Sequence, residues 1–265
     1  MSAYDQIKTE FERTGARACI RRLDRKSLRR FQRPLAIDIV TDASGEYFDI
    51  QLAVNVGLAV VDVQPRHRHL LLSAWNVFGE DRFLCGHDEQ HWFAAALPRG
   101  PDAANVEAAK EALKPELVVR LEQRKHKGKR HRKHDVYLRQ GEWFFIPCPH
   151  VGIDRSRVMR AGILSRGGGS KPHYSSFLYE DGEREYGCAR YPKLAFFESE
   201  YMHILQTRRK AKQWKWRQLP FNPDRYVKGW IEHEDHSPLF LDVWHRVEMN
   251  RESNNLSMSR MIYRD

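Results

Sequence analysis

Histidine and aspartate side chains near the C-terminal end of the chain form a candidate metal site. His233, Asp235 and His236 lie within four residues of one another, and His245 follows nine residues later. His173 can complete the set from another strand. Imidazole and carboxylate groups are common ligands of catalytic divalent metals, which keep one position open for water. The sequence therefore predicts a Zn²⁺, Mn²⁺ or Mg²⁺ site and, as one alternative function, a metal-dependent phosphodiester hydrolase or nuclease.

The same residues also fit a polar hairpin turn followed by a core-packed Trp244-His245 pair, which would bind no metal. Other catalytic signals are weak. The chain has no G-x-S-x-G nucleophile elbow, and no cysteine has the local partners of a thiol enzyme. The sequence therefore predicts no particular catalytic residue.

The densest charge in the chain lies at residues 124–134, which hold seven Lys or Arg, three His and one Gly. Burying so many unpaired cations would cost several kcal/mol each, so the run must lie in solvent. Such a run favours a polyanion, most simply nucleic acid. The cations expected to contact it are Arg124, Lys125, Lys127, Lys129, Arg130, Arg132 and Lys133.

Two further segments concentrate positive charge. Residues 1–33 carry ten Lys or Arg against four acids, and residues 207–217 carry six with no acid. Together with the central run, these segments carry a net charge of +19. Because the whole chain has a net charge of +10, the remaining residues carry −9. Segregated charge of this kind is typical of a polyanion-binding surface. The candidate contacts here are Arg21, Arg22, Arg25, Arg29, Arg208, Arg209, Lys212 and Lys215.

Two tryptophans alternate with cations in the last of these segments. On a strand, Trp214 and Trp216 would share one face and Lys215 would point to the other. Bases stack on such rings, with a contribution of about 1–3 kcal/mol per base, while neighbouring cations hold the phosphates. The alternative is that both tryptophans belong to the core and the cations merely flank them.

A glycine-rich segment, RGGGSK, runs from Arg166 to Lys171. Consecutive glycines let backbone N–H groups converge on an anion, and the two flanking cations add charge. The spacing of a P-loop is absent. The segment is therefore either a phosphate-binding loop, most simply for a nucleic-acid backbone, or a plain surface loop.

The hydrophobic pattern predicts an α+β fold. We expect a basic helical segment over residues 2–32 broken near Gly15, then an antiparallel meander of about six strands over 35–97. A helix over 105–122, kinked at Pro115, would cover the sheet, and a smaller β-rich half would follow with a helix at 198–210 and a final hairpin. The expected parts are 1–123, a basic exposed linker at 124–135, and 136–265, as separate domains or as one continuous domain.

The bulk composition limits the class of protein. The N-terminus lacks the apolar stretch of a secretory signal, no run is long enough to cross a bilayer, and four scattered cysteines form no C-x-x-C pair. We therefore expect a cytoplasmic nucleic-acid-binding protein, for DNA or RNA, in a nucleoprotein complex. Besides the hydrolase, the other alternative is a protein-interaction module that docks on an acidic partner.

Overall fold

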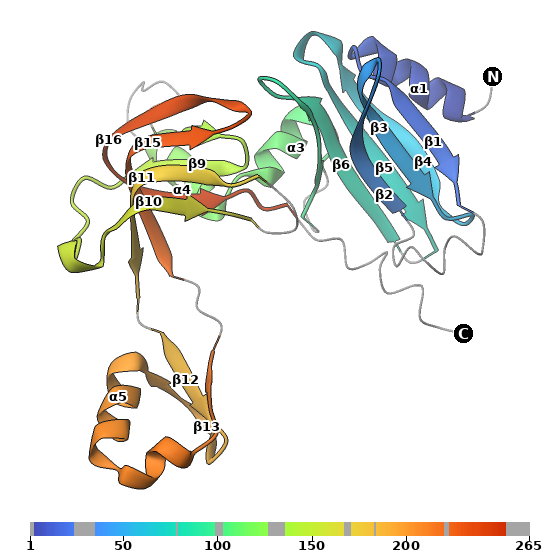
Figure 1. The fold of residues 1–265 in the computed structure, drawn as a ribbon. Coiled ribbons are helices and arrows are strands. Elements are labelled where there is room, and N and C mark those ends of the chain that lie inside the picture. The colour runs from blue at the N-terminus through green and yellow to red at the C-terminus, as the bar shows by residue number, and fades with distance from the viewer. Residues whose placement is uncertain are drawn as a thin grey trace. The chain divides into compact units, whose positions relative to one another are not determined.

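The computed structural model describes residues 3–23, 35–77, 79–98, 103–126, 136–166, 171–182, 184–219 and 223–252. Strands outnumber helices in these ranges, which confirms the α+β class (Figure 1). The chain forms two compact units, residues 1–144 with 249–265 and residues 145–248. Among the described residues, no helix combines the length and the apolar character that crossing a membrane requires.

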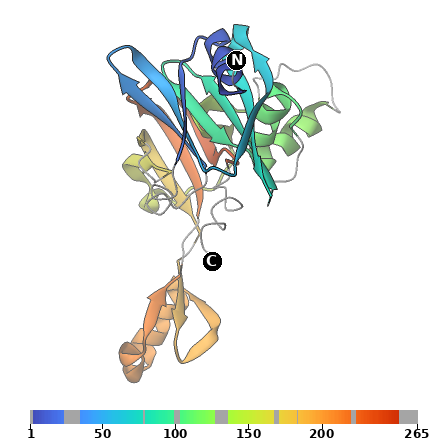
Figure 2. The same ribbon diagram turned by 90° about the vertical axis from the view of Figure 1, so that its right-hand side faces the viewer.

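Unit 1 begins with helix α1 (Ala3–Arg13), which buries Ile7 and Phe11. The helix lies against strands of this unit (Figure 1 and Figure 2). The expected continuation of helix after Gly15 is wrong, because β1 (Ala18–Arg22) follows as a strand. Gly15 has φ +84°, a left-handed conformation that ends a helix at low cost. Beyond it, parallel pairing with β3 holds the segment extended.

The expected single meander is divided into two sheets. The first contains β1, β2 (Leu35–Asp42) and β3 (Gly45–Leu52) in the order β1-β3-β2. Because β3 is paired on both sides, no edge of it is available to the next strand. A second antiparallel sheet therefore forms from β4 (Gly57–Gln64), β5 (His69–Asn76), β6 (Gly79–His87) and β7 (Trp92–Ala96), in that order. The three expected hairpins are confirmed.

An aromatic group lies at the centre of the unit 1 core. Phe48 is fully buried, with its ring centroid 4.8 Å from Phe11 and 5.6 Å from Trp92. These rings belong to one apolar cluster that joins α1 to both sheets. The core therefore depends on contacts between segments far apart in the sequence.

A second apolar cluster lies between the β4–β7 sheet and helix α3 (Val106–Leu113), where Val106 and Ala109 are fully buried. The Asn105 side chain caps this helix by accepting from the amide of Ala108 at 2.8 Å. The expected single helix kinked at Pro115 is instead two helices. Helix α3 ends at Leu113, and α4 (Glu116–His126) begins after Pro115. Lys114 is extended at ψ 141°, as expected for a residue that precedes proline.

Strands β8 (Leu138–Gln140) and β9 (Trp143–Pro147) follow in the chain, and β9 crosses the unit boundary. The main sheet of unit 2 has the order β10-β11-β15-β16-β9. Its strands are β10 (Met159–Leu164), β11 (His173–Asp181), β15 (Asp224–His233) and β16 (His236–Met249), and the 3₁₀ turn η3 (Arg155–Arg157) precedes them. The expected final hairpin is confirmed as β15 and β16.

Residues 184–219, here named the small module, lie in the chain between β11 and β15. Its strands β12 (Glu185–Cys188), β13 (Tyr191–Phe197) and β14 (Trp216–Gln218) form a sheet in the order β13-β12-β14. Helix α5 (Glu198–Thr207) packs on β12 and β13, and the 3₁₀ turn η4 (Arg209–Gln213) follows it. The expected helix over 198–210 is confirmed as far as Thr207, where α5 ends; Arg208 is extended, and η4 follows as a separate turn.

Candidate nucleic-acid interface and histidine cluster

Aromatic side chains hold the small module together. The rings of Tyr186 and Tyr201 are stacked with centroids 4.1 Å apart, which joins β12 to α5. Trp216 packs edge-on against Tyr201 at 4.9 Å and against Phe196 at 5.6 Å. Its indole Nε1 donates to the carbonyl of Ala211 at 2.9 Å, which satisfies the polar end of the ring. A core of large rings thus positions a short, highly charged segment.

Trp214 and Trp216 lie side by side, but they do not share a strand as the alternation predicted: Trp214 is the C-cap residue of η4, and β14 begins only at Trp216. Their rings are stacked with centroids 5.8 Å apart and planes inclined by 27°, and both are half-buried. The guanidinium of Arg190 lies over Trp214 at 5.2 Å from its centroid, a cation–π geometry. The tryptophans therefore take part in the module core and at the same time hold a cation at its surface, and base stacking on them stays a prediction.

The small module is strongly basic. It holds nine Lys or Arg against three Glu, a net charge of +6 in thirty-six residues. The cations that residues 208–217 present to solvent are Arg208, Arg209, Lys210, Lys212, Lys215 and Arg217. A compact element with this charge density produces a positive potential that attracts polyanions.

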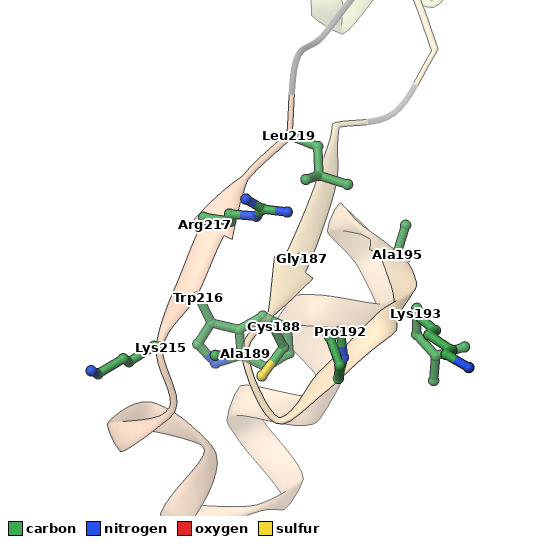
Figure 3. Close-up of a pocket in the computed structure, with 11 residues that line it drawn as sticks. Gly187, Cys188, Ala189, Pro192, Lys193, Ala195, Lys215, Trp216, Arg217 and Leu219 are labelled. Carbon is green, nitrogen blue, oxygen red and sulfur yellow. The ribbon is translucent and has the colours of Figure 1, made fainter.

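A pocket of about 510 Å³ lies on the small module (Figure 3). Trp216, Cys188 and Leu219 give it apolar surface. Figure 3 shows Lys215 and Lys193 at opposite sides of this pocket with their side chains extending outward, and Arg217 directed from β14 towards β12. The pocket therefore combines apolar walls with three cations.

Gly187 leaves the space that Arg217 occupies. A Cβ atom at this position would lie 3.3 Å from Nε of Arg217 and 3.2 Å from Cδ2 of Leu219. Both distances are tighter than ordinary van der Waals contact, so a side chain here would require Arg217 and Leu219 to shift by a few tenths of an ångström. The glycine in the central strand thus permits the cation to lie across β12.

Arg21 and Arg22 lie on strand β1 and not on the expected helix face. Arg21 donates to the Asp49 carboxylate at 2.6 Å, and Asp49 is 4% exposed. Arg22 donates to the hydroxyl of Tyr4 at 2.6 Å and to the carbonyl of Val54 at 3.0 Å. Both guanidinium groups thus bind within unit 1, and their contact with nucleic acid stays a prediction.

Several of the other predicted contacts cannot be placed. Arg124 is exposed on α4, whereas Arg25, Arg29, most of the central basic run and the Gly-rich stretch lie outside the described residues or side chains. In the RGGGSK segment, Arg166 is exposed, and Nζ of Lys171 pairs with the carboxylates of Asp235 at 2.7 Å and Glu234 at 3.4 Å. In the central basic run, the predicted contacts whose side chains lie outside the described part of the chain are Lys125, Lys127, Lys129, Arg130, Arg132 and Lys133.

Three histidines meet at one end of the main sheet of unit 2. His173 begins β11, His233 ends β15 and His236 begins β16. Ring centroids lie 4.1 Å apart for His173 and His233, and 4.7 Å apart for His233 and His236. One nitrogen of each ring lies within 4.8 Å of the other two. The pKa of His173 is lowered to about 3, mainly by burial and also by the charges of its two histidine neighbours.

Two of the predicted metal ligands are not part of this cluster. Asp235 forms the ion pair with Lys171 instead. His245 lies farther along β16, opposite Val227, and its Nδ1 is 2.8 Å from the carbonyl oxygen of Val243. Burial lowers the pKa of His245 as well, which is consistent with a neutral core histidine.

Sequence reasoning missed a second cationic pocket, of about 650 Å³, in unit 2. Arg155, Arg160 and Lys228 line it together with the rings of Phe177 and Trp244. These residues come from separate segments, and the strand pairing that brings them together has a β-bulge between Ser175 and Phe177. The one local sequence signal for this pocket was Phe177, an aromatic residue on the exposed face of β11.

No protein-family model matches the chain, and neither does any curated protein or any solved structure. The function proposed below is therefore argued from the residues and geometry of this chain.

Proposed function

We propose that the protein binds nucleic acid through the small module and prefers single strands. The observation that carries this proposal is the pocket in which Lys193, Lys215 and Arg217 accompany the apolar surface of Trp216. A nucleotide needs both chemistries, because its phosphate is anionic and its base has an apolar face. Aromatic surface beside a positively charged groove is typical of single-strand binding proteins.

The charge of the module supports phosphate contacts beyond the pocket. Arg208, Arg209 and Lys212 are exposed and precede the pocket cations Lys215 and Arg217 in the chain. No aspartate or glutamate interrupts residues 207–217. Lys and Arg that neutralise phosphates release condensed counterions, which supplies most of the affinity of nonspecific binding.

The size of the pocket favours an unpaired nucleotide. Its volume of about 510 Å³ falls within the range of roughly 300–1,000 Å³ that is usual for small-molecule sites. A base inside a duplex is stacked and paired, and extruding it costs a few kcal/mol. A single strand avoids most of this cost, so we expect it to bind more tightly than a duplex of equal length.

A salt titration of the full chain with a fluorescent 20-nucleotide oligo-dT tests the proposal. We expect affinity to fall with salt, with a log–log slope of about −0.7 per phosphate contact. Arg217→Ala should weaken binding about fivefold and make the slope shallower by about one contact. The matched control is Arg66→Ala, an exposed arginine of unit 1, which should leave both quantities unchanged.

Two results would contradict the proposal. One is an affinity that does not change with salt, because phosphate contacts require counterion release. The other is binding of polyglutamate of similar charge as tight as that of oligo-dT, which would instead favour docking on an acidic protein partner.

A further inference from the structure

We propose that His173, His233 and His236 form a binding site for one divalent transition-metal ion, which takes Zn²⁺ in preference to Mg²⁺. The site is independent of the proposed nucleic-acid binding, because it lies on β11, β15 and β16 and shares no residue with the small module.

The three side chains converge because of strand register. His233 is paired with His236 across the β15–β16 hairpin, and Tyr174, next to His173, is paired with Glu232, next to His233. Residues directly opposite on neighbouring antiparallel strands have Cβ atoms about 4.5–5.5 Å apart and point to the same face. Three adjacent strands therefore place three imidazoles in one row.

The spacing of the ring nitrogens fits a metal after small adjustments. Each ligand atom lies within 4.8 Å of the other two. An ion at the centre of such a triangle would be at most about 2.8 Å from each nitrogen, and Zn–N bonds are about 2.0–2.1 Å. Inward shifts below about 1 Å, which side-chain rotation can supply, would close the site.

The donor set selects the kind of metal. Three imidazoles suit Zn²⁺ and its transition-metal neighbours, whereas Mg²⁺ requires oxygen ligands in near-ideal octahedral geometry. Of the carboxylates in the turn between His233 and His236, that of Asp235 pairs with Lys171 at 2.7 Å and that of Glu234 lies 3.4 Å from the same ammonium group. His173 is fully buried while His233 and His236 are half-buried, so an ion can enter from the side of the turn.

One hydrogen bond makes the proposal specific. The backbone N–H of Asp235 donates to Nδ1 of His233 at 3.1 Å. A metal bound at Nδ1 would displace this amide. A metal bound at Nε2 of a neutral ring requires the proton on Nδ1, which then cannot accept. Binding through either nitrogen of neutral His233 therefore breaks this hydrogen bond.

Titration of the metal-free full chain, carrying no histidine tag, with Zn²⁺ and with Co²⁺ tests the site by calorimetry and by the visible absorption of bound Co²⁺. We expect one ion per chain and no comparable heat with Mg²⁺. His236→Ala and His233→Asn should each weaken binding at least about 100-fold, since each removes one of three ligands. The matched control is His150→Ala, an exposed histidine of the same unit, which should bind normally.

A second readout is the backbone amide resonance of Asp235 by NMR, which should move when one equivalent of Zn²⁺ is added and stay in place in His236→Ala. The proposal is overturned if wild-type protein binds less than half an equivalent of Zn²⁺, or if both histidine variants, folded by circular dichroism, bind like wild type. It is also overturned if Mg²⁺ binds as tightly as Zn²⁺. None of these results depends on nucleic acid, so they test this site separately from the proposed function.

Discussion

The double replacement Lys212→Glu with Lys215→Glu is expected to weaken binding of the full chain to single-stranded oligo-dT about 100-fold at physiological salt. Two phosphate contacts are lost, and two carboxylates then repel the strand from the same surface. Both lysines are exposed, so the fold should tolerate the change. Fluorescence anisotropy at several salt concentrations measures the effect.

The control for this prediction carries the same change in net charge elsewhere. Arg13→Glu with Arg66→Glu alters two exposed cations of unit 1. If the lost affinity reflected only the net charge of the protein, the two double variants would bind equally weakly. An effect of the control as large as that of the module variant would therefore contradict a localised interface.

Replacement of Phe48 by alanine is expected to destabilise unit 1 by about 3–5 kcal/mol, the usual cost of removing a large buried aromatic side chain. Phe48 is fully buried and contacts the rings of Phe11 and Trp92. The cavity would therefore open where α1 and the two sheets meet. Urea denaturation of the full chain, followed by circular dichroism, measures the change in the free energy of unfolding.

Phe240→Ala removes the same atoms from an exposed position and is the matched control. Its side chain is 54% exposed, so we expect a cost below about 1 kcal/mol. A similarly small cost for Phe48→Ala would show that the described core does not stabilise unit 1.

Local patterns predicted most strands of the fold but not all of their partners. Alternating apolar residues and turn signals define the β2–β3 hairpin, whose register follows from its own short turn. The strand β1 was missed because Arg21 and Arg22 belong to a run of arginines at helical spacing. Its extended form depends on parallel pairing with β3, about thirty residues away, and local spacing carries no information about such a partner.

The candidate metal site was predicted only in part, because one of its ligands depends on a strand pairing that the local sequence does not specify. His233 and His236 flank a hairpin turn, so their proximity follows from the local sequence. The contribution of His173 required a third strand, which the sequence allowed without specifying its register. Asp235 was expected to be a ligand because nothing in its neighbourhood indicates the ion pair with Lys171, sixty-four residues away.

The proposed nucleic-acid interface rests on charge and composition in the sequence, and the structure adds the arrangement of the side chains. The alternation of Trp214 and Trp216 indicated a shared side, and the rings do lie together. The pocket beside Trp216 was not predictable, because it requires β12 to pair with β14 on one side and with β13, which carries Lys193, on the other. Sheet pairing within the module creates that combination.

Photochemical cross-linking tests most directly where nucleic acid binds. The full chain is irradiated with a single-stranded oligonucleotide that contains 5-iodouracil, and cross-linked peptides are mapped by mass spectrometry. The account predicts that the main cross-links fall within residues 184–219, at Trp216 or its neighbours in the pocket, and disappear in Lys212→Glu with Lys215→Glu. Cross-links confined to other parts of the chain, and unaffected by that variant, would contradict it.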